Sequence, residues 1–281
     1  MSRRRVTRRG RAALLGGGIG LLLPALLLAL WEVLSRSGLV PPNLLPAPSA
    51  VLRALRDLWL SGELWGHIEV TLIRVLLGFL LGTAVATVLG VLTGYSSLWR
   101  RLFDPTFQAL RSIPSFAWIP LFVLWLGIFE ASKVTLIAVG AFFPVYLNTM
   151  AGIQQVDRKL VEVARIHGYG GASLVWHVLL PATLPAYITG LRGGLGLAWM
   201  FVVAAEFMGA SEGLGFLLID GQQTGRPANI IAAVLLFAVF GKLSDLGLAW
   251  LGRRFVSWQD SFQNAEEKKA DAADPARLQE V

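Results

Sequence analysis

Long stretches without a charged side chain constrain this 281-residue chain more than any other feature. A helix that crosses a bilayer needs about 20 mostly apolar residues. The sequence has charge-free stretches at residues 12–31, 75–99, 112–129 and 134–156, and two apolar stretches with few charges at residues 184–207 and 229–251. A soluble domain could not cover six such stretches with the polar surface available here. We therefore predict an all-α, polytopic membrane protein with six transmembrane helices.

The composition excludes most enzymes and soluble binding proteins. Charged residues make up only 15% of the chain, against about 25% in soluble domains. The chain has no cysteine and three histidines, which excludes thiolate sites and leaves little for a metal centre. An intramembrane enzyme is disfavoured because His67, His167 and His177 all fall outside the apolar stretches. We expect no catalytic residue and no metal site, and hence a protein that is not an enzyme.

The distribution of lysine and arginine predicts the orientation, because cytoplasmic loops of membrane proteins are enriched in both. If the N-terminus is cytoplasmic, the basic clusters at residues 1–11, 100–111, 158–165 and 253–277 all lie inside. Both termini are therefore expected in the cytoplasm. This pattern explains the sequence pI near 10.2 without nucleic acid as a partner.

The N-terminal quarter divides into three segments. Residues 1–11 form a basic cytoplasmic segment, and residues 12–34 could be a cleaved signal peptide or a retained anchor helix. We favour the anchor, because the apolar stretch is long and no small-residue cleavage pattern follows it. Residues 35–63 are expected outside, where Ser49 would cap a short helix on the membrane interface; a simple spacer fits almost as well.

Glycine marks the second expected span, and proline marks the third and the fourth. Gly78, Gly82, Gly90 and Gly94 recur at multiples of four, so they present a flat face to another helix. Proline within the spans frees backbone carbonyls, which neighbours or a wet cavity must satisfy. Both helix packing and a water-filled path are compatible with this pattern.

The segment of residues 157–181 reads DRKLVEVARIHGYGGASLVWHVLLP. Asp157 is expected to cap a helix that runs to about His167, and glycines then break it. Ser173 would cap a second helix that ends before Pro181. Its apolar side chains are too numerous to remain in water, so they must pack on the protein's own helices, on lipid or on another protein.

This hairpin resembles the EAA loop of ABC importer permeases of the type I fold. The matching positions are Glu162, Ala164, Gly168, Val178, Leu180 and Pro181. The loop also includes Val163, which departs from the pattern because alanine is usual there. Other segments, including RSIPSFAWIPLFVLWLGI and LPATLPAYITGLRGGLGLAWMFVVAAE, resemble the sulfonate, taurine and nitrate branch of this family. The likeness is greatest to the aliphatic sulfonate permeases.

The resemblance implies a division of labour. Residues 64–252 would form a five-helix transport domain of the inner membrane, followed by a cytoplasmic tail at residues 253–281. Two permease subunits, here expected to be two copies of this chain, would form a path through the membrane lipid for a small organic anion. An alkanesulfonate is the main expectation, with taurine, nitrate or another small solute as alternatives. A dimeric ABC ATPase would bind the hairpins, and a substrate-binding protein would deliver the solute outside.

The chain itself has no phosphate-binding loop of the G-x-x-x-x-G-K-[ST] type. We therefore expect no cofactor on this chain, with ATP and magnesium used by the partner ATPase. An ion channel or secondary transporter would instead need pore-lining polar repeats or two matching broken halves, and the sequence shows neither. A purely structural scaffold is the remaining alternative.

Charged or polar groups within the spans are candidates for the transport path, because burying them in a membrane is costly. They are Arg74, Asn148, Arg192 and Glu206. Arg192 could line the path, pair with Glu206 across a dimer, or extend to the cytoplasmic side. Arg74 could extend toward the outer surface or pair with Glu69 or Glu206. Lys242 and Asp245 are expected to neutralise each other, and residues 209–225 could fold back as an outer gate.

Overall fold

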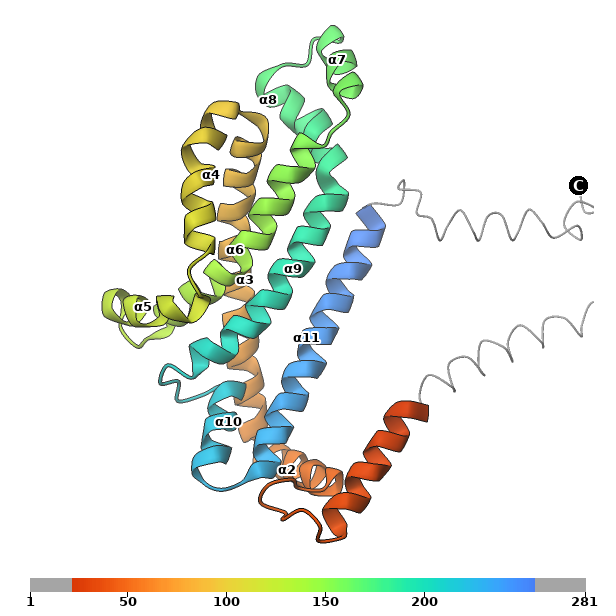
Figure 1. Cartoon of the computed structure of the whole chain (residues 1–281), viewed down its shortest axis with the longest axis vertical. Coiled ribbons are helices and arrows are strands. Elements are labelled where there is room, and N and C mark those ends of the chain that lie inside the picture. Colours follow the sequence, from red (N-terminus) through yellow and green to blue (C-terminus); the bar gives the residue numbers. More distant parts are fainter. Residues whose placement is uncertain (1–21, 256–281) are drawn as a thin grey trace, which may run out of the picture. The chain divides into compact units, whose positions relative to one another are not determined.

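The computed structural model describes residues 22–255, and every regular element within them is a helix (Figure 1). The predicted all-α fold is therefore confirmed. Residues 22–36 form a helix, which is the later part of the predicted anchor. The start of that anchor, the basic N-terminal segment and most of the tail lie outside the described residues.

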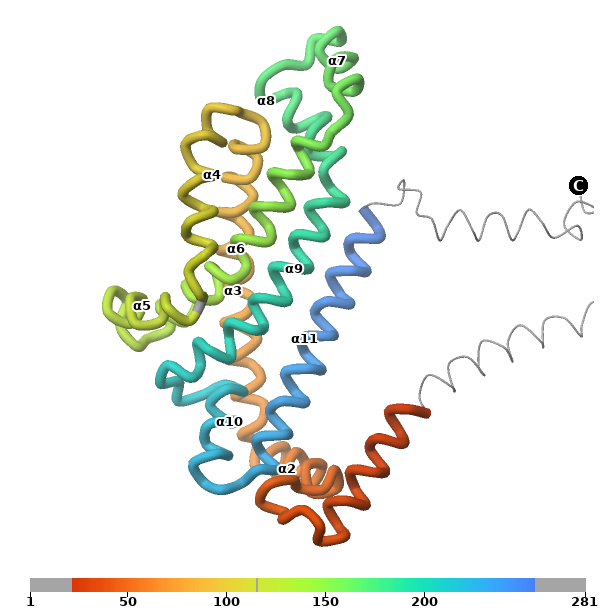
Figure 2. The backbone as a smooth tube through the Cα atoms, viewed as in Figure 1, coloured from red at the N-terminus to blue at the C-terminus, as the bar shows by residue number. Residues whose placement is uncertain are grey.

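The helices follow one another with short connections, as the backbone trace shows (Figure 2). After the helix of residues 22–36 they are α2 (Pro48–Leu60), α3 (Glu63–Tyr95), α4 (Ser97–Arg111), the 3-10 helix η1 (Ser115–Trp118), α5 (Ile119–Leu126), α6 (Glu130–Gln154), α7 (Arg158–Ile166), α8 (Gly171–Leu174), the π-helical turn η2 (Val175–Leu179), α9 (Leu180–Glu206), α10 (Leu214–Gln223) and α11 (Pro227–Phe255).

The chain forms two compact units. Within the described residues, the first unit comprises residues 22–76, Ile119–Val134 and Met200–Phe240, and the second comprises Leu77–Trp118, Thr135–Trp199 and residues 241–255. Helices α3, α6, α9 and α11 contribute residues to both units.

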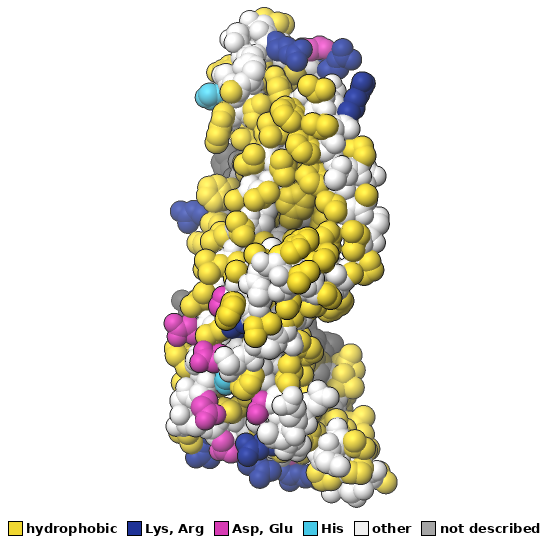
Figure 3. All heavy atoms as spheres, turned by 90° about the vertical axis from the view of Figure 1, so that its left-hand side faces the viewer, with side chains coloured by type: hydrophobic (Ala, Val, Ile, Leu, Met, Phe, Trp, Pro, Cys, Tyr) yellow, Lys and Arg dark blue, Asp and Glu magenta, His cyan; other side chains and the backbone are white. Residues whose placement is uncertain are grey.

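Four helical stretches of the described chain are long and apolar enough to cross a membrane: Glu63–Tyr95, Glu130–Gln154, Gly171–Glu206 and Pro227–Phe255. The bent pair Ser97–Arg111 and Phe116–Leu126 would make a fifth if counted as one span. The predicted number of six helices is thus not confirmed. In the most apolar window of α11 only 11% of the residues are buried, and hydrophobic side chains dominate the face drawn in Figure 3. These surfaces suit contact with lipid or with another subunit.

The prediction of one continuous third span over residues 112–129 is wrong. Helix α4 ends at Arg111, and α5 has only 8 residues. The residue before a proline is disfavoured in the α-helical region, which explains the interruption at Pro114. Gly127 then turns the chain with a φ of 75°. Because eight helical residues extend about 12 Å, α5 alone cannot cross a bilayer.

Three of the four predicted glycines, Gly82, Gly90 and Gly94, form a packing face on α3. A Cβ atom added at Gly82 would overlap the Ala138 carbonyl oxygen, and one at Gly90 would lie 2.8 Å from the Thr149 Cβ. The same holds at Gly94, where the Ile153 Cβ would lie 2.9 Å away. Helix α6 therefore approaches α3 closely along this face, which confirms the packing interpretation.

We expect Gly90→Ala to lower the melting temperature of the purified protein. Overpacking costs about 1–3 kcal/mol, which outweighs the gain of about 1 kcal/mol in helix propensity. Gly196→Ala in α9 is the matched control, because a Cβ there meets no atom within 4 Å. If both variants melt alike, the close approach of α6 to α3 does not stabilise the protein.

The core of the first unit joins α3, α10 and α11. Its buried members are Leu64, Ile68, Leu214, Leu217 and Ala233. Leu55 and Leu58 of α2 pack against them, so the predicted helix after the proline-rich segment is confirmed. It begins differently, however, because Pro48 occupies the first turn after Ala47 and Ser49 does not cap it. Proline suits the first helical position, where its missing N–H costs nothing.

Candidate functional site

The hairpin of residues 157–179 has a first arm, α7, that agrees with its prediction. The Asp157 carboxylate accepts a hydrogen bond of 2.9 Å from the Lys159 backbone N–H and so caps α7. The helix ends at Ile166, followed by His167 as the C-terminal cap. Gly168 then takes a φ of 84°, a left-handed conformation that favours glycine.

The second arm corrects two predictions. Gly170, rather than Ser173, occupies the N-cap position of α8. The helical stretch does not stop at Pro181 but continues from Gly171 to Glu206. A π-helical turn at Val175–Leu179 directly precedes the proline. Proline has no N–H for the usual helical bond, and a local π turn is one way for a helix to accommodate this defect.

One face of the hairpin is packed and the other is open. Ala164, Leu174 and Leu179 are buried in a cluster with Ile153 of α6, and Val178 packs against that cluster. In contrast, Ile166 is 83% exposed and Trp176 is 70% exposed. Val163 and Leu160 are also exposed on α7. Both arms thus present large apolar side chains that nothing within the described residues covers.

Glu162 lies on α7 beside the exposed apolar residues. Its carboxylate accepts a bond of 3.1 Å from Arg158 Nε, one helical turn earlier, and both side chains are largely exposed. The structure therefore places Glu162 in a solvated local ion pair, and its predicted contact with an ATPase stays a prediction. Leu180 and Pro181 continue into α9 rather than forming part of the turn.

A second candidate site lies in the first unit around Arg74 of α3. Its guanidinium donates to both carboxylate oxygens of Glu130, at 2.7 and 2.6 Å. Nη1 donates to Glu206 Oε1 at 2.9 Å and to the Glu212 carbonyl at 2.7 Å. Lys133 adds a bond of 3.0 Å to Glu130. The two cations balance the two carboxylates, of which Glu206 is buried and Glu130 is exposed.

Glu206 joins this group to the start of α10. Its side chain is fully buried, and it accepts bonds from Thr71 Oγ1 at 2.7 Å and from the Gly215 N–H at 2.6 Å. Thr71 in turn accepts from the Leu214 N–H at 2.8 Å. A carboxylate at a helix N-terminus satisfies unpaired N–H groups and the helix dipole. Glu206 therefore fixes α10 against α3.

The sequence predicted Glu206 as one possible partner of Arg74, but it did not indicate the other partners in this group. Glu130 ends the charge-free stretch of residues 112–129, and Lys133 precedes the one at residues 134–156. Their position at the start of a helix could therefore be predicted. Thr71 and Gly215 carried no such signal. Of the two partners proposed for Arg74, the structure shows Glu206, and Glu69 makes no ion pair with it.

Arg192 and Asp245 form a third charged contact, within the second unit. Arg192 of α9 donates from Nε and Nη2 to the two carboxylate oxygens of Asp245 in α11, at 2.8 and 2.9 Å. The Arg192 side chain keeps 47% of its surface exposed. The predicted pairing of Lys242 with Asp245 is corrected, because within the described chain the ion pair of Asp245 is with Arg192.

Asn148 lies at the contact between α6 and α9. Its amide donates a bond of 2.8 Å to the Pro144 carbonyl of its own helix. A Cβ added at Gly190 of α9 would lie 2.8 Å from the Asn148 Cβ. The structure thus gives Asn148 a packing contact, and its place in a transport path stays a prediction.

Comparison with known proteins decides the family. A family model described as binding-protein-dependent transport system inner membrane component matches residues 78–257. The chain belongs to this family. A protein of Bacillus subtilis named as an aliphatic sulfonates transport permease, SsuC, is 43% identical over 244 residues, which cover 87% of this chain and 88% of the relative.

Other relatives of this permease have related names. The Escherichia coli protein named as the aliphatic sulfonates permease SsuC is 38% identical over 87% of this chain and 93% of the relative. The E. coli taurine transport system permease protein TauC is 33% identical over 85% of this chain and 89% of the relative.

Family membership confirms three expectations. The permease is a multi-pass membrane protein and the transport component of an ABC importer, not an enzyme. Hydrolysis of ATP belongs to a separate chain, and a substrate-binding protein is a further component. The exposed hairpin and the two buried or half-buried charge groups are therefore to be understood as parts of a transporter.

Proposed function

We propose that this permease imports an alkanesulfonate through a path formed by two copies of the chain in the cell inner membrane. The names of its relatives support the substrate class, with sulfonate permeases at higher identity than the taurine permease. Taurine, nitrate or another small solute is the alternative, since a nitrate import permease is also among its relatives. Both termini are cytoplasmic, and ATP and magnesium are bound by the partner ATPase.

One observation carries the mechanical part of the proposal: the large apolar side chains exposed on both arms of the hairpin. Ile166 is the last residue of α7, and Trp176 lies on the stretch that continues directly into α9. A hydrophobic pocket of an ATPase subunit would cover them, and burial of each is worth about 1.5–3 kcal/mol. Closure of the ATPase dimer would then turn the hairpin and α9 together, which changes access to the path.

The substrate is tested by transport in vesicles that contain the permease, its ATPase and its binding protein. We expect ATP-driven uptake of labelled ethanesulfonate, competed by other alkanesulfonates more strongly than by taurine or nitrate. Stronger competition by taurine or nitrate would identify that solute as the better substrate and contradict the assignment of an alkanesulfonate.

We propose that Arg192 binds the transported anion, because about half of its side-chain surface stays exposed beside Asp245. The exchange Arg192→Asp with Asp245→Arg keeps an ion pair but moves the cation from α9 to α11. If Arg192 contacts substrate, uptake falls about tenfold or more in the exchanged protein, as for loss of a charge-assisted hydrogen bond, while the melting temperature is retained. Recovery of full uptake by the exchange would instead show that the pair is only structural.

A further inference from the structure

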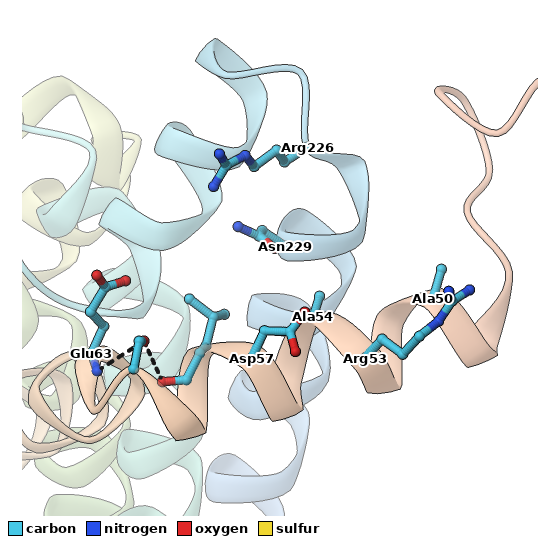
Figure 4. Close-up of a pocket in the computed structure, with 9 residues that line it drawn as sticks. Ala50, Arg53, Ala54, Asp57, Glu63, Arg226 and Asn229 are labelled. Atoms are coloured by element: carbon cyan, nitrogen blue, oxygen red, sulfur yellow. Dashed lines mark hydrogen bonds between the residues drawn. The ribbon is translucent and has the colours of Figure 1, made fainter.

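An open pocket of about 560 Å³ lies in the first unit, between α2, the start of α3 and the start of α11 (Figure 4). Its charged lining consists of Arg53, Asp57, Glu63 and Arg226. None of these four forms an ion pair within residues 22–255. Four unpaired charges of balanced sign around one pocket suit a ligand that carries both a positive and a negative group.

Asn229 is the second observation that points to a ligand. The residue lines the pocket and is only 8% exposed. Its backbone N–H bonds to the Arg226 carbonyl at 3.0 Å, but its side-chain amide makes no hydrogen bond within the described chain. Figure 4 shows Arg226 and Asn229 projecting from the same side, across from Glu63. Because Asn229 lines the pocket and its amide has no partner within the described chain, this amide is available to bond a ligand there.

A second, mainly apolar hollow of about 420 Å³ adjoins the first. The two share Ala50, Arg53, Arg226 and Asn229. The second is otherwise lined by Ser35, Pro42, Pro46, Ala47, Pro227 and Ala228. A molecule that fills both would need a zwitterionic end and an apolar end.

The surroundings of the pocket match a membrane interface. Leu52, Trp59 and Leu60 of α2 are each more than 60% exposed, although α2 also carries the charged pocket residues. The Trp59 ring meets the Trp65 ring edge-on at 6.1 Å. Amphipathic helices with tryptophan lie at the level of lipid headgroups. An amphiphile at this position would come from the bilayer itself.

We infer that this pocket binds a zwitterionic phospholipid of the phosphatidylethanolamine type. Arg226 and Asn229 donate to the phosphate, and Glu63 and Asp57 receive the ammonium group. The glycerol and the first acyl carbons enter the apolar hollow beside Pro42 and Pro227. The inference does not depend on the transported solute, because none of these residues is a proposed path residue.

Native mass spectrometry of the full chain, purified after exposure to defined vesicles, tests the site. We expect one phosphatidylethanolamine retained per chain, and less retention of phosphatidylglycerol, which lacks the ammonium group. Arg226→Gln should lower the retained lipid about tenfold, as for loss of a charge-assisted hydrogen bond. Arg56→Gln removes an arginine of α2 that does not line the pocket, and it should leave the retained lipid unchanged.

Three outcomes would overturn the inference. Equal loss of lipid in Arg226→Gln and Arg56→Gln would remove the pocket as the site. Retention of phosphatidylglycerol equal to that of phosphatidylethanolamine would show that the site does not recognise the ammonium group. Displacement of the lipid by a soluble aminosulfonate at low concentration would assign the pocket to a soluble ligand. Arg226 is exposed, so its variant should fold, and Asn229→Leu with its melting temperature gives a second measurement.

Discussion

Ile166→Asp should reduce ATP-driven uptake about a hundredfold or more, because the apolar contact of about 1.5–3 kcal/mol is lost at each of two proposed ATPase contacts and a charge enters an apolar interface. Ile166 is 83% exposed in the chain alone, so the substitution leaves the fold intact. Uptake in vesicles and co-purification of the ATPase measure the effect.

The matched control is Ile166→Leu, which keeps an apolar side chain of the same volume and should retain most of the uptake. The melting temperature of both variants should equal that of the parent. Full uptake and normal ATPase association in Ile166→Asp would contradict a role for this face of the hairpin.

Arg74→Gln should destabilise the protein by about 3–5 kcal/mol, because it leaves a buried carboxylate without its cation. Glu206 is fully buried and Arg74 is nearly so, with 5% of its side chain exposed. The substitution also removes the bond to the Glu212 carbonyl. Hydrogen exchange should therefore rise in residues 207–223, which these bonds hold against α3.

Thermal unfolding of the purified variant measures the loss, with Arg56→Gln as the control for removal of an exposed arginine. Glu206→Gln should cost less than Arg74→Gln, since an amide oxygen still accepts from the Gly215 N–H. A loss in Arg74→Gln no larger than in Arg56→Gln would show that the network contributes nothing to stability.

Local patterns allowed correct predictions wherever neighbours in sequence decide the structure. Asp157 caps α7 through a residue two positions away, and Gly168 turns the chain by its own conformation. The flat face of α3 was readable from glycine spacing alone, without knowing that α6 would cover it. Such features depend on the backbone of a few adjacent residues.

Contacts between distant segments could not be predicted in the same way. Arg74 is separated by 56 residues from Glu130, and the sequence did not indicate that contact. Glu206, 132 residues from Arg74, was one of two predicted partners, but the sequence could not decide between it and Glu69. Arg192 and Asp245 are separated by 53 residues. The sequence therefore favoured Lys242, three residues from Asp245, as its ion-pair partner, and this prediction was wrong. The continuity at Pro181 was missed because a π turn at Val175–Leu179 has no sequence signature. The absence of charged residues over 112–129 likewise gave no sign that the helix is interrupted at Pro114.

Crosslinking from single cysteines tests the central claim most directly, because the chain has no cysteine of its own. Ile166→Cys and Trp176→Cys should each crosslink to the ABC ATPase in the assembled transporter, whereas Leu60→Cys on α2, equally exposed, should not. Absence of a crosslink at both hairpin positions, while a small thiol reagent still labels them in the assembled complex, would contradict the account.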